Sequence, residues 1–109
     1  MPTFEVGDIV RVPFPYTDRA TRQHRPALIV GTIEGHGLLW VVMITSAENR
    51  RWPLDVPAPD GPETGLPVPS WIRPAKIATI DARDAQRIGR SPDSAFNAVQ
   101  HAVREILSL

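Results

Sequence analysis

The sequence predicts a mainly β domain that ends in one helix, arranged as a small barrel or a strongly curved sheet. Short apolar segments rich in β-branched residues alternate with turn residues over most of the chain. The chain holds 12 prolines in 109 residues, which favours short strands and shaped loops over long helices. Only the C-terminal segment places apolar residues at helical spacing. This length suits one hydrophobic core, so we expect a single domain over residues 1–109.

Four strands are expected in the first half of the chain. Val10, Val12 and Phe14 alternate with other residue types, so the first strand should place them on one face. Two glycines beside His36 suit a hairpin turn over residues 34–37, because glycine readily adopts a positive φ. The strand before this turn should be buried on both faces, and the strand after it is the most apolar segment. The expected strands are residues 6–14, 27–32, 38–45 and 54–56, with a polar loop over residues 16–24.

A long loop, two short strands and a helix are expected in the second half. Residues 57–69 contain five prolines and two glycines, which predicts a loop that crosses the sheet. Extended pieces at 71–73 and 76–80 should be separated by Pro74, since proline cannot donate a hydrogen bond to a ladder. We expect Ser91 to cap the helix and Pro92 to occupy its first position. The apolar stripe expected to face the sheet is Phe96, Val99, Val103 and Ile106.

The composition limits the classes of function. Lysine plus arginine and aspartate plus glutamate number 12 each, so the sequence does not predict a broadly basic surface, although a local basic patch is compatible with it. There is no cysteine, and the three histidines have no metal-site spacing, so we expect no metal site and no cofactor. No apolar run approaches the roughly 20 residues that cross a bilayer, and the N-terminus shows no signal-peptide pattern. We therefore expect a cytoplasmic protein with no membrane partner.

Arg25 is the first candidate functional residue. It stands immediately before Pro26 and the buried run Ala27–Val30, where a rigid strand could direct its guanidinium toward an anionic ligand. The alternative is an ordinary surface arginine in a hairpin loop. Thr45, at the end of the next apolar strand, is the second candidate. The alternative is an ordinary strand-end threonine whose hydroxyl bonds to the backbone.

Several short blocks of the sequence resemble the MazF/PemK family of toxins. In chain order they are GDIV at 7–10, PFP at 13–15, RPALIV at 25–30, ITS at 44–46, PSWIR at 69–73, KIATID at 76–81 and IG at 88–89. The resemblance implies a curved SH3-like barrel of the MazF/PemK/CcdB type that forms a homodimer. It also implies a sequence-selective, metal-independent endoribonuclease that cuts single-stranded messenger RNA and is held inactive by a cognate antitoxin.

The resemblance assigns roles to particular residues. Arg25 matches the catalytic arginine of the family and Thr45 the hydroxyl residue that acts with it. Ser70 and Arg73 match positions near the RNA groove. Two acidic positions of some members are occupied here by Ala75 and, approximately, Ala20, so a carboxylate base is in doubt. The accessory or RNA-binding candidates are His24, Ser46, Arg22, Tyr16, Arg50, Arg51, Ser70, Arg73 and Lys76, with Trp52 and Trp71 as further residues that could stack on bases.

The expected chemistry is attack of the RNA 2′-hydroxyl on the adjacent phosphorus. Arg25 suits phosphate binding, because a guanidinium is planar, permanently charged and able to grip two oxygens. The general base stays open between His24, a backbone group and water. Two other functions also stay open: a CcdB-like toxin that binds DNA gyrase, and a catalytically inactive binding module of the same fold.

Overall fold

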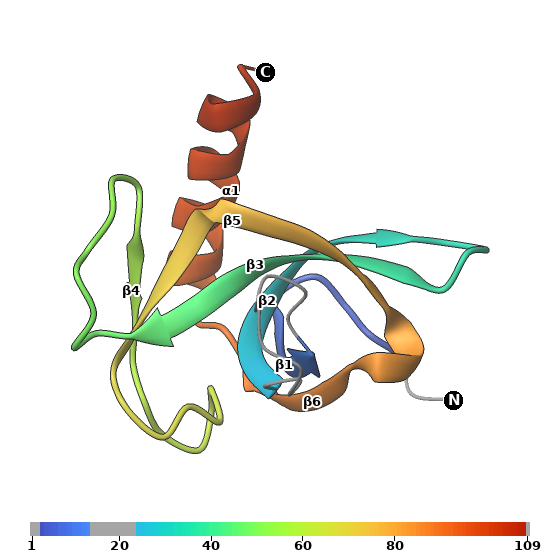
Figure 1. Cartoon of the computed structure of the whole chain (residues 1–109), viewed down its shortest axis with the longest axis horizontal. Coiled ribbons are helices and arrows are strands. Elements are labelled where there is room, and N and C mark those ends of the chain that lie inside the picture. Colours follow the sequence, from blue (N-terminus) through green and yellow to red (C-terminus); the bar gives the residue numbers. More distant parts are fainter. Residues whose placement is uncertain (1–2, 14–23, 109) are drawn as a thin grey trace.

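The computed structural model describes residues 3–13 and 24–108. These residues form one six-stranded antiparallel sheet that curls strongly, followed by one α-helix (Figure 1). The elements are β1 (Asp8–Pro13), β2 (His24–Ile33), β3 (Leu38–Ser46), β4 (Val56–Ala58), β5 (Ser70–Asp81), the 3₁₀ turn η1 (Ala82–Asp84), β6 (Gln86–Arg90) and α1 (Asp93–Leu107). The strand order is β4-β5-β3-β2-β1-β6. This confirms the predicted class, a mainly β fold with a C-terminal helix.

Each face of the sheet carries a cluster of buried residues. Ala27, Leu28 and Ile29 of β2 follow one another and none has accessible surface, although neighbours in a strand point to opposite faces. We call one side the barrel face: Val10, Val12, Ala27, Ile29, Leu39, Val41, Met43, Ala78 and Ile80. The other is the helix face, where Ile9, Leu28, Val42, Ile44, Ala58, Leu66 and Ile72 pack with Ala95 and Val99 of α1. Curling closes the barrel face on itself, and α1 covers the helix face beside β4 and β5 (Figure 1).

A β-bulge in β2 sets the register of the central hairpin. Next to the 34–37 turn, Thr32 pairs with Leu39 and Gly31 with Trp40. Beyond it, Ile29 pairs with Val41, so Val30 is an extra residue on β2. A bulge of this kind shifts every later pairing by one residue, and a one-residue shift moves each side chain to the other face.

The fourth and fifth strands differ from the sequence prediction. Residues 71–73 and 76–80 belong to one strand, β5, rather than to two pieces. Pro74 is accommodated because the ladder with β3 jumps there, from Val42 opposite Ile77 to Met43 opposite Arg73. The short strand expected at 54–56 is instead Val56–Ala58, since residues 52–55 form a tight turn in which Asp55 N–H donates to the Trp52 carbonyl at 3.2 Å.

Strand β6 was not expected from the sequence, and it forms an edge of the sheet beside β1. Buried Asp8 of β1 accepts hydrogen bonds from Arg87 at 2.7 Å and Arg90 at 3.1 Å, which fastens the two strands together. The 59–66 loop lies on this strand so closely that a Cβ on Gly89 would overlap the backbone of Thr64. Glycine is therefore required at position 89 by contact rather than by φ.

The helix begins one residue later than expected. Pro92 occupies the N-cap position and provides no side-chain cap, whereas the Ser91 hydroxyl donates to the Pro92 carbonyl at 3.0 Å. The buried helix residues are Ala95, Val99 and Ala102, with Phe96 and Val103 at the flanks. Ile106, expected in the stripe, is 46% exposed, because α1 extends past the sheet before it ends (Figure 1). Within the described residues, α1 lacks the length and apolar character of a membrane-spanning helix.

Candidate functional site

The register of the sheet brings Arg25 and Thr45 to the same end of the barrel face. The β2–β3 ladder pairs Leu28 with Val42 and Ala27 with Met43, and this register, continued by two residues, sets Arg25 opposite Thr45. Arg25 also pairs with Val12, a residue of the barrel face. On the other side, Thr45 pairs with Trp71 of β5. Because paired residues in an antiparallel ladder project to the same face, adjacent strands converge on this end of the barrel face.

This arrangement depends on the β2 bulge. The pairing next to the 34–37 turn, continued without the extra residue Val30, would set Thr45 opposite Pro26. Arg25 would then project to the face opposite Thr45. The bulge is thus a structural requirement for bringing the two predicted catalytic residues together.

The Thr45 hydroxyl is held in a local hydrogen-bond network. Thr45 is only 9% exposed, and its Oγ1 accepts a hydrogen bond from Asn49 Nδ2 at 2.7 Å. Asn49 follows β3 in a turn in which its N–H donates to the Ser46 carbonyl at 3.0 Å. The Ser46 hydroxyl accepts from Glu48 N–H at 3.3 Å within the same turn. A hydroxyl that accepts one bond can still donate its own proton, so Thr45 retains the capacity to bind an anionic oxygen.

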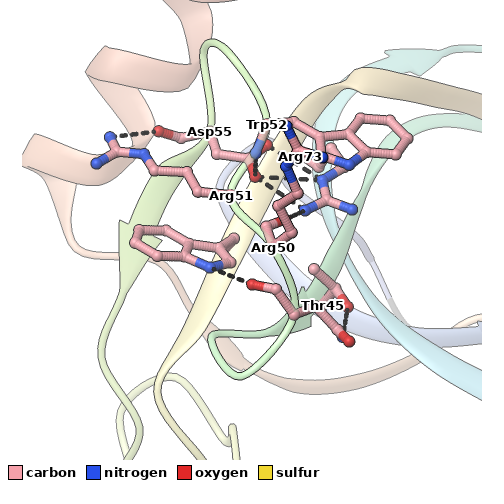
Figure 2. A network of polar contacts seen from close by, with 8 residues as sticks. Thr45, Arg50, Arg51, Trp52, Asp55 and Arg73 are labelled. Atoms are coloured by element: carbon pink, nitrogen blue, oxygen red, sulfur yellow. Dashed lines mark hydrogen bonds and ion pairs between the residues drawn. The ribbon is translucent and has the colours of Figure 1, made fainter.

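Arg73 lies in a buried ion pair rather than on an open surface. Its guanidinium contacts the carboxylate of Asp55 at 3.0 to 3.2 Å through Nε and Nη2, and both residues are buried (Figure 2). Nη2 also donates to the Arg50 carbonyl at 2.8 Å, and Cζ lies 4.0 Å from the centre of the Trp52 ring. The side chain predicted to face RNA therefore fixes the 47–55 loop against β5.

Cations of this loop and of the adjacent β5 lie beside two tryptophans, Trp52 of the loop and Trp71 of β5. Arg51 places Cζ 4.8 Å from the Trp71 ring centre and donates to the Asp55 carbonyl at 3.1 Å. Lys76 places Nζ 4.9 Å from the Trp52 ring centre. Arg50 and Arg51 are exposed, and Trp52 is 37% exposed. A chain of zero net charge thus presents a local cationic and aromatic surface, which we call the 47–55 loop surface.

Other predicted residues are not gathered at this end of the barrel face. His24 is exposed and precedes Arg25 in β2, so alternation directs it to the opposite face. Ser70 is buried and its hydroxyl donates to the Val68 carbonyl at 2.9 Å, and its partner Ser46 alternates away from Thr45. Tyr16, Arg22 and Ala20 lie outside the described residues.

Asn49 and Asp55 are the residues that the sequence analysis did not single out. Asn49 had a weak signal, because Asn three residues after a strand-end Ser is typical of a turn. Asp55 had none, since its partner Arg73 is 18 residues away. Over residues 3–13 and 24–108, no three His, Asp or Glu side chains converge as metal ligands.

The fold and this site define a small curled-sheet protein whose candidate residues Arg25 and Thr45 lie at one end of the barrel face. A family model described as PemK-like, MazF-like toxin of type II toxin–antitoxin system matches residues 5–107. The chain belongs to this family. Toxins of the family are generally endoribonucleases. A comparison with curated protein sequences gave no significant match.

Solved structures of MazF toxins share the fold. MazF of Deinococcus radiodurans (Form-I) superposes with a TM-score of 0.80 at 19% identity, over 100% of both chains. Mycobacterium tuberculosis toxin MazF-mt6 gives 0.72 at 23% identity, over 94% of this chain and 97% of that one. An endoribonuclease in complex with its cognate antitoxin from a mycobacterial species gives 0.72 at 20% identity, over 94% and 93%.

Proposed function

We propose that this chain is an endoribonuclease toxin that cleaves single-stranded messenger RNA and is neutralised by a cognate antitoxin. The observation that supports the proposal is the β2–β3 register, which, continued two residues beyond Ala27 and Met43, aligns Arg25 with Thr45 beside the 47–55 loop surface. Family membership supports the same activity. The proposed toxin is a single domain that acts in the cytoplasm as a homodimer.

In the proposed reaction the RNA supplies its own nucleophile. The 2′-oxygen bonds to phosphorus, the bond from phosphorus to the 5′-oxygen breaks, a base takes the 2′ proton, and the 5′-oxygen gains one. The Arg25 guanidinium binds the phosphate oxygens, where negative charge accumulates. The Thr45 hydroxyl donates to one of these oxygens. Since His24 projects to the other face of β2, a backbone carbonyl or water is the better candidate for the base.

The decisive experiment compares variants on a short single-stranded RNA in the presence of a chelator. The parent should leave a 2′,3′-cyclic phosphate and a 5′-hydroxyl, and a deoxyribose at the cut position should block cleavage but not binding. Arg25→Ala should slow cleavage about 100- to 1,000-fold, as loss of a transition-state donor does. Thr45→Val should slow it about tenfold, the equivalent of one hydrogen bond.

The control is Arg83→Ala, since Arg83 of η1 pairs with the neighbouring Asp81 and its side chain is 85% exposed. Melting curves show whether each variant is folded. A folded Arg25→Ala protein that cuts RNA at the parent rate would overturn the site. A folded parent that arrests growth without cutting RNA would favour the gyrase-binding alternative. A folded parent that neither cuts RNA nor arrests growth would favour the inactive binding module.

The antitoxin should act at the same end of the molecule. MazE–MazF complexes of Deinococcus radiodurans share the fold of this chain, with a TM-score of 0.77 for one crystal form. An acidic segment would pair with Arg50 and Arg51 of the 47–55 loop surface and displace RNA. We expect charge reversal at both arginines to weaken the complex and reduce its dependence on salt.

A further inference from the structure

The contacts of Asn49 suggest a role that the proposed function leaves unassigned, and the inference rests on that function. We propose that Asn49 is a positioning residue that directs the Thr45 hydroxyl proton toward the RNA phosphate. Its side-chain amide is a donor to Thr45 Oγ1 at 2.7 Å.

Asn49 is itself fixed on several sides, so it can fix Thr45. The backbone N–H of Asn49 donates to the Ser46 carbonyl at 3.0 Å, and the backbone carbonyl of Asn49 accepts from Trp71 Nε1 at 3.2 Å. Trp71 is the residue that pairs with Thr45 across the β3–β5 ladder. The turn after β3 is therefore tied back to the strand beside it, although Asn49 lies at the exposed surface.

The direction of the hydrogen bond gives this contact its proposed role. An amide NH₂ group can only donate, so Thr45 Oγ1 must accept with a lone pair. The hydroxyl proton then lies away from Asn49 and can be donated to a phosphate oxygen held by Arg25. An acceptor at position 49 would reverse this bond and draw the Thr45 proton away from the substrate.

The side chain at position 49 can be replaced by one of nearly the same shape that accepts a hydrogen bond instead of donating one. Asn49→Asp is nearly isosteric, but a carboxylate only accepts, whereas a carboxylic acid can donate. Asn49→Ala removes the donor and adds no charge. Asn97→Asp, on the exposed side of α1, introduces the same charge change away from the site.

Single-turnover cleavage of the short RNA at saturating enzyme is the readout, because it separates the chemical step from binding. At neutral pH, Asn49→Ala should slow the step about tenfold, the equivalent of one hydrogen bond. Asn49→Asp should slow it more than Asn49→Ala, while Asn97→Asp keeps the parent rate. As the pH falls toward the carboxyl pKa near 4, the rate of Asn49→Asp relative to the parent should rise, since the acid form donates again.

A double-mutant cycle tests whether Asn49 acts through Thr45. In a Thr45→Val background, Asn49→Ala should change the rate by less than about twofold, because the group that it positions is gone. Equal effects of Asn49→Ala in the two backgrounds would overturn the proposal. So would an Asn49→Asp enzyme with the parent rate, or one whose relative rate does not change with pH. A folded parent that cuts no RNA would overturn the proposed function itself, and this role with it.

Discussion

At the scale of single residues, the buried Asp55–Arg73 pair governs the 47–55 loop. The Asp55 carboxylate accepts from Trp52 N–H at 2.8 Å as well as from Arg73 at 3.0 Å (Figure 2). Arg73 in turn holds the Arg50 carbonyl and lies over Trp52. One carboxylate thus connects the tight turn of the loop to β5, and the cations on the surface take their positions from it.

Removal of that carboxylate should be strongly destabilising. Asp55→Asn leaves the Arg73 charge buried without an anion, which typically costs about 3–5 kcal/mol. The free energy of unfolding, measured in urea, should fall by that amount. Asp81→Asn is the matched control, because Asp81 also accepts from an arginine, Arg83 at 2.8 Å, but at an exposed turn.

Asp81→Asn should lower the free energy of unfolding only slightly, because the Asp81–Arg83 pair lies at an exposed turn. The pKa of Asp81 determines how this contribution depends on pH. Hydrogen bonds from the Arg83 side chain and backbone hold the pKa of the Asp81 carboxyl below its ordinary value. Its small contribution is therefore present at neutral pH and is lost as the pH falls through that lowered pKa. If the two substitutions lower the free energy of unfolding equally, the Asp55 carboxylate does not hold the 47–55 loop against β5.

At the scale of elements, two substitutions in α1 can show which of its side chains anchor it to the sheet. Val99 has no accessible surface, whereas Ile106 is 46% exposed, although both belong to the stripe predicted from the sequence. Val99→Ala should lower the free energy of unfolding by roughly 1.5–3 kcal/mol, the value of a buried aliphatic side chain. Ile106→Ala should change it by less than about 0.5 kcal/mol. Equal losses measured in urea would show that the end of the helix is packed in solution.

The strands that the sequence predicted are those whose pattern is local. Residues 27–32 and 38–45 are apolar runs on either side of a glycine turn, and β2 and β3 include both runs. Gln86–Arg90 contains only Ile88 as a large apolar residue, and its strand state comes from pairing with β1, far away in sequence. A prediction from single windows therefore misses β6.

The candidate site likewise has one part that the sequence predicts and another that depends on contacts between distant segments. Arg25 and Thr45 could be named from the sequence because each lies at the end of an apolar run and because the resemblance to the MazF/PemK family implies a role for both. The register that aligns them across β2 and β3 could not be derived, since it depends on the extra residue Val30, and a bulge has no clear signature there. The burial of Arg73 was missed because its partner Asp55 belongs to another segment.

At the scale of the whole molecule, an apolar strip on the helix face remains exposed beyond α1. Trp40 is 45% exposed and Ile77 39%, and they lie on adjacent strands, since Trp40 pairs with Thr79 and the next residue on that face, Val42, with Ile77. We expect a second copy of the chain to cover this strip. Light scattering at micromolar concentration should give twice the chain mass.

A charge at the strip should weaken that dimer. Trp40→Glu should shift the scattering mass toward that of one chain, because a carboxylate in an apolar interface is costly. Val68→Glu is the control, since Val68 is 42% exposed on the long loop between β4 and β5. A parent that scatters as a single chain would contradict the homodimer, and an unchanged Trp40→Glu dimer would place its interface elsewhere.

The pairing of β1 with β6 determines when the protein can finish folding on the ribosome. Asp8 pairs with Arg90, so this edge of the sheet cannot form until β6, 82 residues later in the chain, has been synthesised. Closing so long a loop is entropically costly and slow compared with forming the β2–β3 hairpin. The segments that hold Arg25, Thr45 and Trp71 emerge earlier, yet the sheet that supports them is completed only afterwards. A nascent chain would therefore complete the end of the barrel face that holds Arg25 and Thr45 only after β6 has left the ribosome.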